Sequence, residues 1–205
     1  MAKGKLVIVT APSGAGKTTL VAALVEGNDQ LCVSVSHTTR PKRPNEVDGV
    51  NYHFIDEAKF LAMLEQGDFL ESAEVYGHRY GTSQSWVDEK LSEGQHVVLE
   101  IDWQGAAQVR NLYPDSCFIF ILPPSLDTLT ERLKARAQDD DDTIEDRMKE
   151  ARDVIEHVCE ADFVVVNDEF ERALEDIRAI IRSEGLKTVV QQLNLSQLLT
   201  SLTRG

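Results

Sequence analysis

One segment near the start of the chain constrains its fold more than any other. Residues 5–10, KLVIVT, form a short apolar and β-branched run that predicts a buried strand. The loop A-P-S-G-A-G follows at residues 11–16, and the residues from Lys17 to about Glu26 have helical character. Together they match the phosphate-binding pattern G-x-x-x-x-G-K-[ST], except that Ala11 replaces the first glycine. A chance G-K-T in a glycine-containing turn is the alternative, and the agreement of strand, loop and helix argues against it.

The residue types in this loop suit the binding of phosphate. Gly14 and Gly16 let the backbone wrap closely around phosphate oxygens and point N–H groups at them. The following helix adds a favourable dipole, while Lys17 can reach the β- and γ-phosphates and the Thr18 hydroxyl can ligate Mg²⁺. The segment therefore predicts a site for a nucleoside triphosphate such as ATP. Its expected residues are Ala11, Pro12, Ser13, Gly14, Ala15, Gly16, Lys17, Thr18 and Thr19.

The rest of the chain alternates apolar runs with helical patterns. Continuous apolar strands separated by helices predict an α/β fold with a parallel sheet covered on both faces. Residues 31–83 are instead strand-like and rich in turns, which predicts an inserted β-rich subdomain. After Gly185, leucines and valines near helical spacing predict a last helix that packs into the core or joins copies of the chain. Expected strands are 97–101, 118–122 and 163–166, and expected helices are 57–66, 84–93, 125–137, 143–159 and 169–183.

Composition excludes several classes of function. The 205 residues include 35 Asp+Glu against 21 Lys+Arg, a net charge of −14 that argues against binding to a nucleic acid polymer. No apolar run approaches the roughly 18 residues that span a bilayer, and the first residues do not resemble a signal peptide. We therefore expect a cytoplasmic protein without a membrane partner. The three cysteines form no C-x-x-C pair and the histidines show no ligand spacing, so no zinc site is predicted.

A phosphate site in so acidic a chain requires a local basic cluster, and residues 36–44 provide one. Arg40, Lys42 and Arg43 fall within four positions of the segment S-H-T-T-R-P-K-R-P. Arginine forks and tyrosine hydroxyls offer directed donors that suit a phosphate monoester. A carboxylate such as Glu71 suits guanine, because the Watson–Crick edge of guanine offers two adjacent N–H donors. For the basic cluster alone, a solvated surface loop is the alternative.

The motifs taken together closely resemble those of the guanylate kinase family. They fall in the family's order from about residue 5 to residue 170, and no N-K-x-D motif of the GTPase families is present. The resemblance implies a P-loop NTPase-type core at 1–32, 84–124 and 160–205, a GMP-binding subdomain at 33–83 and a helical lid at 125–159. The motifs are A-P-S-G-A-G-K-T, S-H-T-T-R-P-x-R, G-x-x-Y-x-F, F-L-E, Y-G-T, L-E-I-D-W-Q-G, I-L-P-P-S, R-L-x-x-R and V-V-N-D.

The resemblance implies a site for GMP and a site for Mg²⁺. The family usually has aspartate at the position of Glu100, whose longer side chain can reach guanine directly, in a shifted position or through water. Asp102 ends the strand-like run 97–101, where it is expected to orient Mg²⁺ or its waters together with Thr18. The residues expected to bind GMP are Ser36, Arg40, Arg43, Tyr52, Glu71, Tyr80, Thr82 and Glu100.

The reaction implied by the resemblance is ATP + GMP → ADP + GDP, with dGMP as a second acceptor. A GMP phosphate oxygen is already a nucleophile, so direct in-line transfer needs no covalent intermediate. Lys17 and lid arginines are expected to stabilise the charge on the transferred group, and Asn167 is expected near the adenine of ATP. The expected catalytic residues are Lys17, Arg132, Arg136 and Arg147.

Two alternatives stay open at this stage. A P-loop kinase for another phosphorylated acceptor would explain the basic cluster but would leave Glu71 and Glu100 without a role. A non-catalytic guanylate-kinase-like module that binds proteins could have lost the phosphate-loop lysine or the lid arginines, and this chain keeps them.

Overall fold

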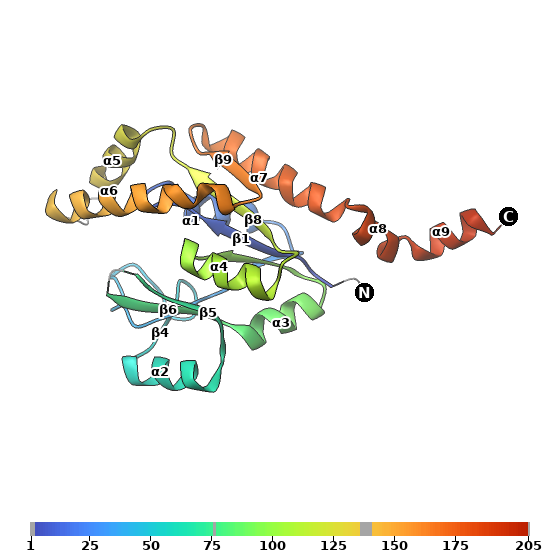
Figure 1. Cartoon of the computed structure of the whole chain (residues 1–205), viewed down its shortest axis with the longest axis horizontal. Coiled ribbons are helices and arrows are strands. Elements are labelled where there is room, and N and C mark those ends of the chain that lie inside the picture. Colours follow the sequence, from blue (N-terminus) through green and yellow to red (C-terminus); the bar gives the residue numbers. More distant parts are fainter. Residues whose placement is uncertain (1–2, 76, 136–140, 205) are drawn as a thin grey trace.

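The computed structural model describes residues 3–75, 77–135 and 141–204, and it confirms the expected α/β class. Five parallel strands form the central sheet (Figure 1). Because continuous apolar runs suit strands that are covered on both faces, the inner strands are almost wholly buried. In spatial order the strands are β2 (Leu31–Val33), β7 (His96–Glu100), β1 (Leu6–Thr10), β8 (Cys117–Leu122) and β9 (Phe163–Val166).

Helices cover the two faces of this sheet and form two hydrophobic clusters. Val7 and Val9 of β1 belong to the cluster made with α1 (Lys17–Val25) and α7 (Phe170–Gly185). The alternate β1 side chains belong to the cluster made with α3 (Gln84–Ser92) and α4 (Trp103–Leu112). This alternation follows from the two-residue period of a strand. Helix α4 was not among the helices predicted from the sequence.

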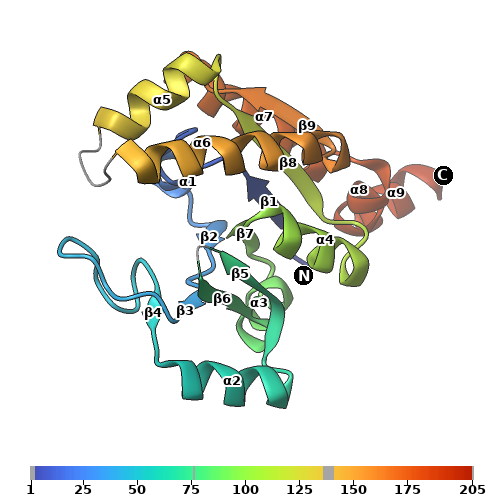
Figure 2. The same ribbon diagram turned by 60° about the vertical axis from the view of Figure 1, so that its left-hand side comes forward.

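A second, mixed sheet of four strands precedes α3 in the chain (Figure 2). Strand β3 runs parallel to β4 and antiparallel to β6, and β6 in turn pairs antiparallel with β5. The spatial order is β4 (His53–Phe54), β3 (His37–Thr38), β6 (His78–Ser83) and β5 (Phe69–Val75), with α2 (Glu57–Gln66) between β4 and β5 in the chain.

Helix α2 occupies the residues predicted for it because both of its ends are specified locally. The side chain of Asp56 caps the first turn by accepting a hydrogen bond from Lys59 N over 2.7 Å. Gly67 ends the helix with a φ of 74°, which glycine adopts without strain. Phe60 is fully buried and stacks on Phe69, so the helix is fixed against the small sheet.

Two further helices lie beside the central sheet near the phosphate loop, as Figures 1 and 2 show. They are α5 (Leu126–Ala135) and α6 (Asp141–Glu156), and a 3₁₀ turn at His157–Glu160 follows α6. Leu129 and Leu133 are the buried side chains of α5.

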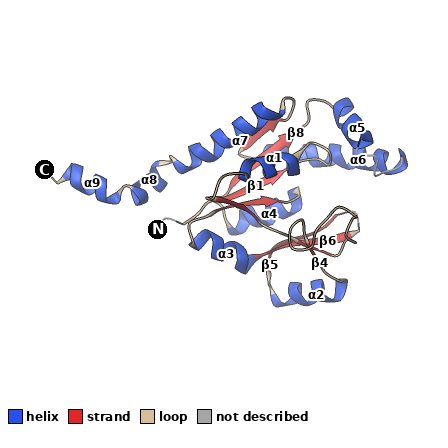
Figure 3. Ribbon diagram, turned by 180° about the vertical axis from the view of Figure 1, so that it is seen from behind, coloured by secondary structure: helices blue, strands red, loops and turns tan. Residues whose placement is uncertain are grey.

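The C-terminal tail extends away from the rest of the molecule as α8 (Thr188–Asn194) and α9 (Ser196–Thr203) (Figures 1 and 3). Core packing, one of the two sequence expectations for this segment, is wrong, because neither helix has a buried residue. Leu193 and Leu202 are 69% and 72% exposed. Among the described residues, none of the helices combines the length and the apolarity needed to cross a lipid bilayer.

Candidate active site

The candidate site lies where β1 and β7 end. Strands of a parallel sheet point the same way, so the loop after β1 and the residues after β7 meet at one edge. Val9 is paired with Glu100 in the register of the two strands. The buried hydroxyl of Thr10 donates a hydrogen bond to Ile101 O over 3.1 Å. This edge therefore brings the phosphate loop, residues 11–16, next to Glu100 and Asp102.

Two glycines shape the phosphate loop. Gly14 and Gly16 have φ angles of 91° and 92°, in the left-handed region that side-chain-bearing residues rarely adopt. A Cβ atom on Gly14 would lie 3.1 Å from the δ-carbons of Leu129 and Leu133, because α5 packs directly on the loop. A Cβ atom on Gly16 would overlap the Nδ2 atom of Asn167. Both positions thus require glycine for conformation and for close packing.

Lys17 and Thr18, the first two residues of α1, face acids from the end of β7. Lys17 Nζ donates to Ile101 O over 3.3 Å, and Thr18 Oγ1 donates to Glu100 Oε2 over 2.8 Å. Burial lowers the pKa of the Lys17 amine, while Glu100, Asp102 and Glu71 act in the opposite direction. The sequence assigned Glu100 to guanine, and here its carboxylate contacts a residue of the expected metal site. Thr19 is exposed on the same helix.

Asp102 is fixed as the N-terminal cap of α4. Its Oδ1 atom accepts a hydrogen bond from Gly105 N over 2.8 Å. Burial raises the pKa of the Asp102 carboxyl group, while the Gly105 N–H and Lys17 act to lower it. The carboxylate is therefore held rigidly beside the lysine of the phosphate loop.

Glu71 of β5 is buried against α4. Its side chain is 4% exposed, and burial raises its pKa to about 7, although hydrogen bonding from Thr82 and the charge of Lys17 oppose the shift. A Cβ atom on Gly105 would lie 2.5 Å from Glu71 Oε2, so this glycine leaves the space that the carboxylate fills. Two further side chains expected in the guanine site adjoin it: Thr82 pairs with Glu71 across the strands, and Ser36 Oγ lies 3.2 Å from Thr82 Oγ1.

Arg40, Tyr52 and Tyr80 form a second group on the small sheet. The Arg40 guanidinium carbon lies 5.4 Å from the centre of the Tyr52 ring, and the two tyrosine rings meet edge to face at 5.8 Å. Burial raises the pKa of Tyr52 to about 12, with Tyr80 and Glu100 adding to the rise and Arg40 opposing it. Arg43 has an exposed side chain at the rim of this group.

Helix α5, in the segment expected to form a lid, contributes Arg132, which reaches the segment after β9. Arg132 Nη2 donates to Asn167 O over 3.0 Å, while its buried Nη1 atom has no hydrogen-bond partner among the described residues. The Asn167 side chain, expected near adenine, donates to Ala15 O of the phosphate loop over 2.7 Å. Arg147 is partly buried on α6, and Arg136 lies outside the described residues.

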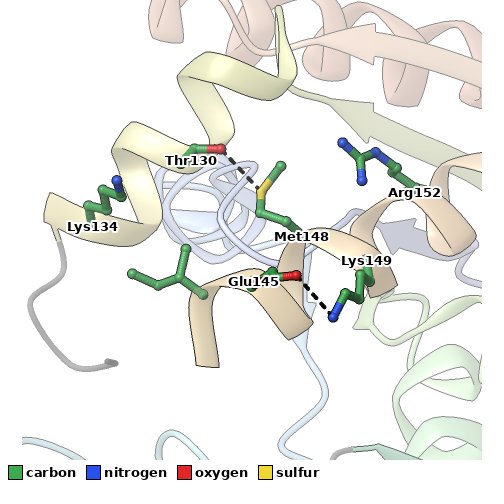
Figure 4. Close-up of a pocket in the computed structure, with 7 residues that line it drawn as sticks. Thr130, Lys134, Glu145, Met148, Lys149 and Arg152 are labelled. Atoms are coloured by element: carbon green, nitrogen blue, oxygen red, sulfur yellow. Dashed lines mark hydrogen bonds and ion pairs between the residues drawn. The ribbon is translucent and has the colours of Figure 1, made fainter. Parts of the chain in front are cut away.

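A pocket between α5 and α6 is separate from this arrangement (Figure 4). No described residue of the expected site lines it, and one of its two lysines, Lys149, is paired with Glu145 over 3.2 Å. The residues that line it are Thr130, Lys134, Ile144, Glu145, Met148, Lys149 and Arg152.

Sequence reasoning missed several residues that shape the site. Gly105 makes room for Glu71, and its signal was a glycine in the first turn after Asp102. Gln108 of α4 exchanges two hydrogen bonds with the backbone of Ser72 on β5, at 3.1 and 2.8 Å. The residues around Gln108 carry no motif that would have predicted this contact. Glu46, just after the basic cluster, binds Arg40.

Comparison with known proteins agrees with these features. The family model described as "Guanylate kinase" matches residues 3–184. The guanylate kinase of Methylobacillus flagellatus is 56% identical, covering 98% of this chain and 99% of that protein. The guanylate kinase of Coxiella burnetii is 51% identical, covering 98% of each.

A solved structure gives the same answer for the fold. The crystal structure of guanylate kinase from Anaplasma phagocytophilum superposes with a TM-score of 0.79 at 33% sequence identity, covering 98% of this chain and 96% of that one. The phosphate loop, the small mixed sheet and the full-length similarity lead to one conclusion: this chain belongs to the guanylate kinase family.

Proposed function

We propose that this chain transfers the γ-phosphoryl group of ATP to GMP, and also to dGMP, to give ADP and the nucleoside diphosphate. One observation carries the proposal. Glu71 of the small sheet and Asp102, just after β7, both flank Gly105, where a Cβ atom would lie 2.5 Å from Glu71 Oε2 and 3.3 Å from Asp102 Oδ1. The charges of both carboxylates also act on the pKa of Lys17 in the phosphate loop. The expected donor and acceptor sites therefore adjoin, as direct transfer between two nucleotides requires.

The small sheet is proposed to bind the acceptor. Glu71, once ionised, would accept the two adjacent N–H groups of guanine, with the hydroxyls of Ser36 and Thr82 beside it. Arg40, Arg43, Tyr52 and Tyr80 would bind the GMP phosphate through directed N–H and O–H donors. Glu100 accepts a hydrogen bond from Thr18 beside the phosphate loop, and its charge contributes to the raised pKa of Tyr52, so it adjoins both the proposed donor site and the proposed GMP phosphate site.

The phosphate loop and the lid are proposed to bind and activate the donor. Backbone N–H groups of residues 11–16 would hold the ATP phosphates, and the attacking GMP oxygen needs no general base. Lys17, Arg132, Arg136 and Arg147 would stabilise charge on the transferred group. The buried, unpartnered Nη1 atom of Arg132 supports this, since it is a donor without an acceptor among the described residues. Asn167 would lie near adenine and would also support the phosphate loop through its hydrogen bond to Ala15 O.

The residues at this edge fit Mg²⁺. Its usual protein ligands are one or two oxygen groups, with substrate phosphates and waters completing the octahedron. Thr18 and Asp102 offer a hydroxyl and a carboxylate next to the phosphate loop, and no group of three metal-ligating side chains occurs in the described part of the chain. When bound, Mg²⁺ would neutralise charge on the phosphates.

Closure of the two flanking segments, 33–83 and 125–159, is part of the proposal. Two anionic substrates repel each other, so cations from both segments must approach them together. Closure also excludes water, which would otherwise hydrolyse ATP. Since ATP and GMP are cytoplasmic nucleotides, we place the reaction in the cytoplasm.

The proposal is tested by ADP release, with Mg²⁺ and ATP, across GMP, dGMP, AMP, UMP, CMP and sugar phosphates. We expect GMP to be the best acceptor and dGMP to follow. Equal use of AMP would remove Glu71 from the guanine site. Preference for a sugar phosphate would favour the alternative acceptor class, and no turnover would favour a binding module.

A second copy of the chain is the proposed partner of the tail. Residues 188–203 contain no charged side chain, in a protein whose net charge is −14. A large net charge of one sign opposes association of copies, so an uncharged apolar surface is a suitable place for contact, and the exposed leucines of α8 and α9 form such a surface. An anionic membrane is a poor partner, because this segment lacks the lysines and arginines of interfacial helices.

A further inference from the structure

Glu46 binds Arg40 through both of its carboxylate oxygens. Arg40 Nη2 donates to Glu46 Oε1 over 2.6 Å, and Arg40 Nη1 donates to Glu46 Oε2 over 3.0 Å. The two side chains are only 12% and 15% exposed. A bidentate pair with so little exposure to water fixes the plane and the direction of the guanidinium.

The hydrogen bonds of Arg40 leave one edge of its guanidinium for a ligand. An arginine has five N–H donors. Glu46 accepts two of them, and Pro41 O accepts another from Nη1 over 2.9 Å. The donors that remain are Nε–H and the outer N–H of Nη2, which lie side by side. The guanidinium carbon lies 5.4 Å from the centre of the Tyr52 ring, which in turn meets the Tyr80 ring, so Arg40 adjoins two tyrosines of the proposed phosphate site.

The same carboxylate fixes the turn that carries Arg43. Glu46 Oε2 also accepts a hydrogen bond from Arg43 N over 2.8 Å, and Glu46 N donates to Arg43 O over 3.1 Å. The pKa of Glu46 is lowered, because hydrogen bonds and charge from Arg40 and Arg43 outweigh its burial, which alone would raise it. One ionised carboxylate thus sets the relative positions of both arginines.

We propose that Glu46 is a positioning residue for the acceptor phosphate. It occupies the end-on fork of Arg40, so that the adjoining edge, formed by Nε and Nη2, is presented ready to bind two phosphate oxygens. A preorganised arginine loses less conformational entropy when the ligand arrives. The inference rests on the proposed use of GMP, and it differs from the idea that Glu46 competes with phosphate for Arg40.

The test compares Glu46→Gln and Glu46→Ala with the wild-type chain. Glu57→Gln is the matched control, since Glu57 pairs with Arg79 over 2.7 Å elsewhere on the small sheet and is 55% exposed. We expect Glu46→Gln to raise KM for GMP by roughly tenfold and Glu46→Ala to raise it further, with KM for ATP unchanged. A merely structural role would lower the active fraction, and hence kcat, at an unchanged KM for GMP.

Calorimetry with GMP and with guanosine separates this role from the proposed function. We expect Glu46→Gln to weaken binding of GMP by the same factor and to leave guanosine binding unchanged, because only GMP carries the phosphate. Equal binding of GMP by variant and wild type, or tighter binding by the variant as competition predicts, would overturn the inference while wild-type turnover stands. If Glu46→Ala does not fold, the isosteric Glu46→Gln decides alone. A wild-type chain that binds no GMP would overturn both proposals.

Discussion

The side-chain amide of Asn167 donates a 2.7 Å hydrogen bond to the carbonyl oxygen of Ala15, which joins the segment after β9 to the phosphate loop. The backbone carbonyl of the same asparagine accepts a hydrogen bond from Arg132 of α5. One residue therefore links the loop that is proposed to hold the ATP phosphates with an arginine that is proposed to act on them.

Replacing Asn167 by alanine should weaken the loop. The variant leaves the buried Ala15 carbonyl without its partner, so we expect the free energy of unfolding to fall by about 1–3 kcal/mol and KM for ATP to rise. Denaturant unfolding and steady-state kinetics measure the two effects. Asn28→Ala is the control, because Asn28 caps an exposed turn. An unchanged KM for ATP would mean that the loop keeps its shape without this bond.

Lys17→Met should abolish most of the turnover while GMP still binds. Methionine has a similar length but no charge, so we expect kcat to fall by about 10²-fold or more. Calorimetric binding of GMP should stay within about twofold of the wild type, given that the acceptor site lies on the small sheet. Lys90→Met, which removes a surface pair with Glu93, is the control. Retained turnover in Lys17→Met would refute the catalytic role of Lys17.

The raised pKa of Glu71 predicts a pH dependence of both stability and binding. In the folded free chain the pKa is about 7, above its usual 4.5, so the folded state holds this proton more tightly than the unfolded state. The contribution of Glu71 to the free energy of unfolding is therefore complete below about pH 4.5 and is lost as the pH rises through about 7. We expect Glu71→Gln to stabilise the free chain at pH 8, by up to about 3 kcal/mol, with a gain that shrinks toward pH 4.5.

The same variant should bind GMP worse, since its amide brings a donor toward the N–H donors of guanine. KM for GMP should rise far more than KM for ATP. For the wild type, KM for GMP should increase as the pH falls through about 7, because protonated Glu71 has lost one acceptor. Equal effects on both nucleotides would place Glu71 outside the guanine site.

Gly105→Ala should impair GMP binding indirectly, because the new methyl group would displace Glu71. The new Cβ atom would lie 2.5 Å from Glu71 Oε2, so the carboxylate must move away from its position in the site. We expect a higher KM for GMP at an unchanged KM for ATP. Gly185→Ala is the control, because a Cβ atom there meets no described atom within 4 Å. Wild-type kinetics in Gly105→Ala would show that Glu71 tolerates displacement.

Charging the tail should separate associated copies. Light scattering of the wild type should give a mass above that of the 22.9 kDa chain, and Leu198→Glu should reduce it toward that value with kcat preserved. Leu112→Glu, at a position 60% exposed but outside the tail, should leave the mass unchanged. A wild-type mass of one chain would remove the tail as a self-association surface.

The sequence predicted those strands and helices whose own residues show a clear pattern of apolar side chains or of end-capping residues. Strands β1 and β8 were predicted because each is a continuous apolar and β-branched run, and helix α2 has ends that Asp56 and Gly67 specify locally. Helix α4 was missed because it buries only small or β-branched residues, such as Ala106 and Val109, which give little apolar periodicity. Strand β2 has three residues, too few for a pattern.

The candidate site likewise has a part that the sequence predicts and a part that only the folded structure shows. The phosphate loop is contiguous in sequence, so its conformation could be derived from its glycines. The contacts of Asn167 with Ala15 and of Gln108 with Ser72 join residues 152 and 36 positions apart, and only the folded arrangement of strands and helices brings them together. Arg136 lies outside the described residues, and its role stays a prediction.

The 3₁₀ turn after α6 contacts the start of α4 through two aromatic rings. The rings of Trp103 and His157 stack with centres 3.6 Å apart and planes 8° from parallel. Flat rings can glide across each other while staying in contact, whereas lifting them apart would expose both faces to water. If the proposed closure moves this segment, the 3₁₀ turn after α6 should therefore slide over the indole and keep its place beside Asp102.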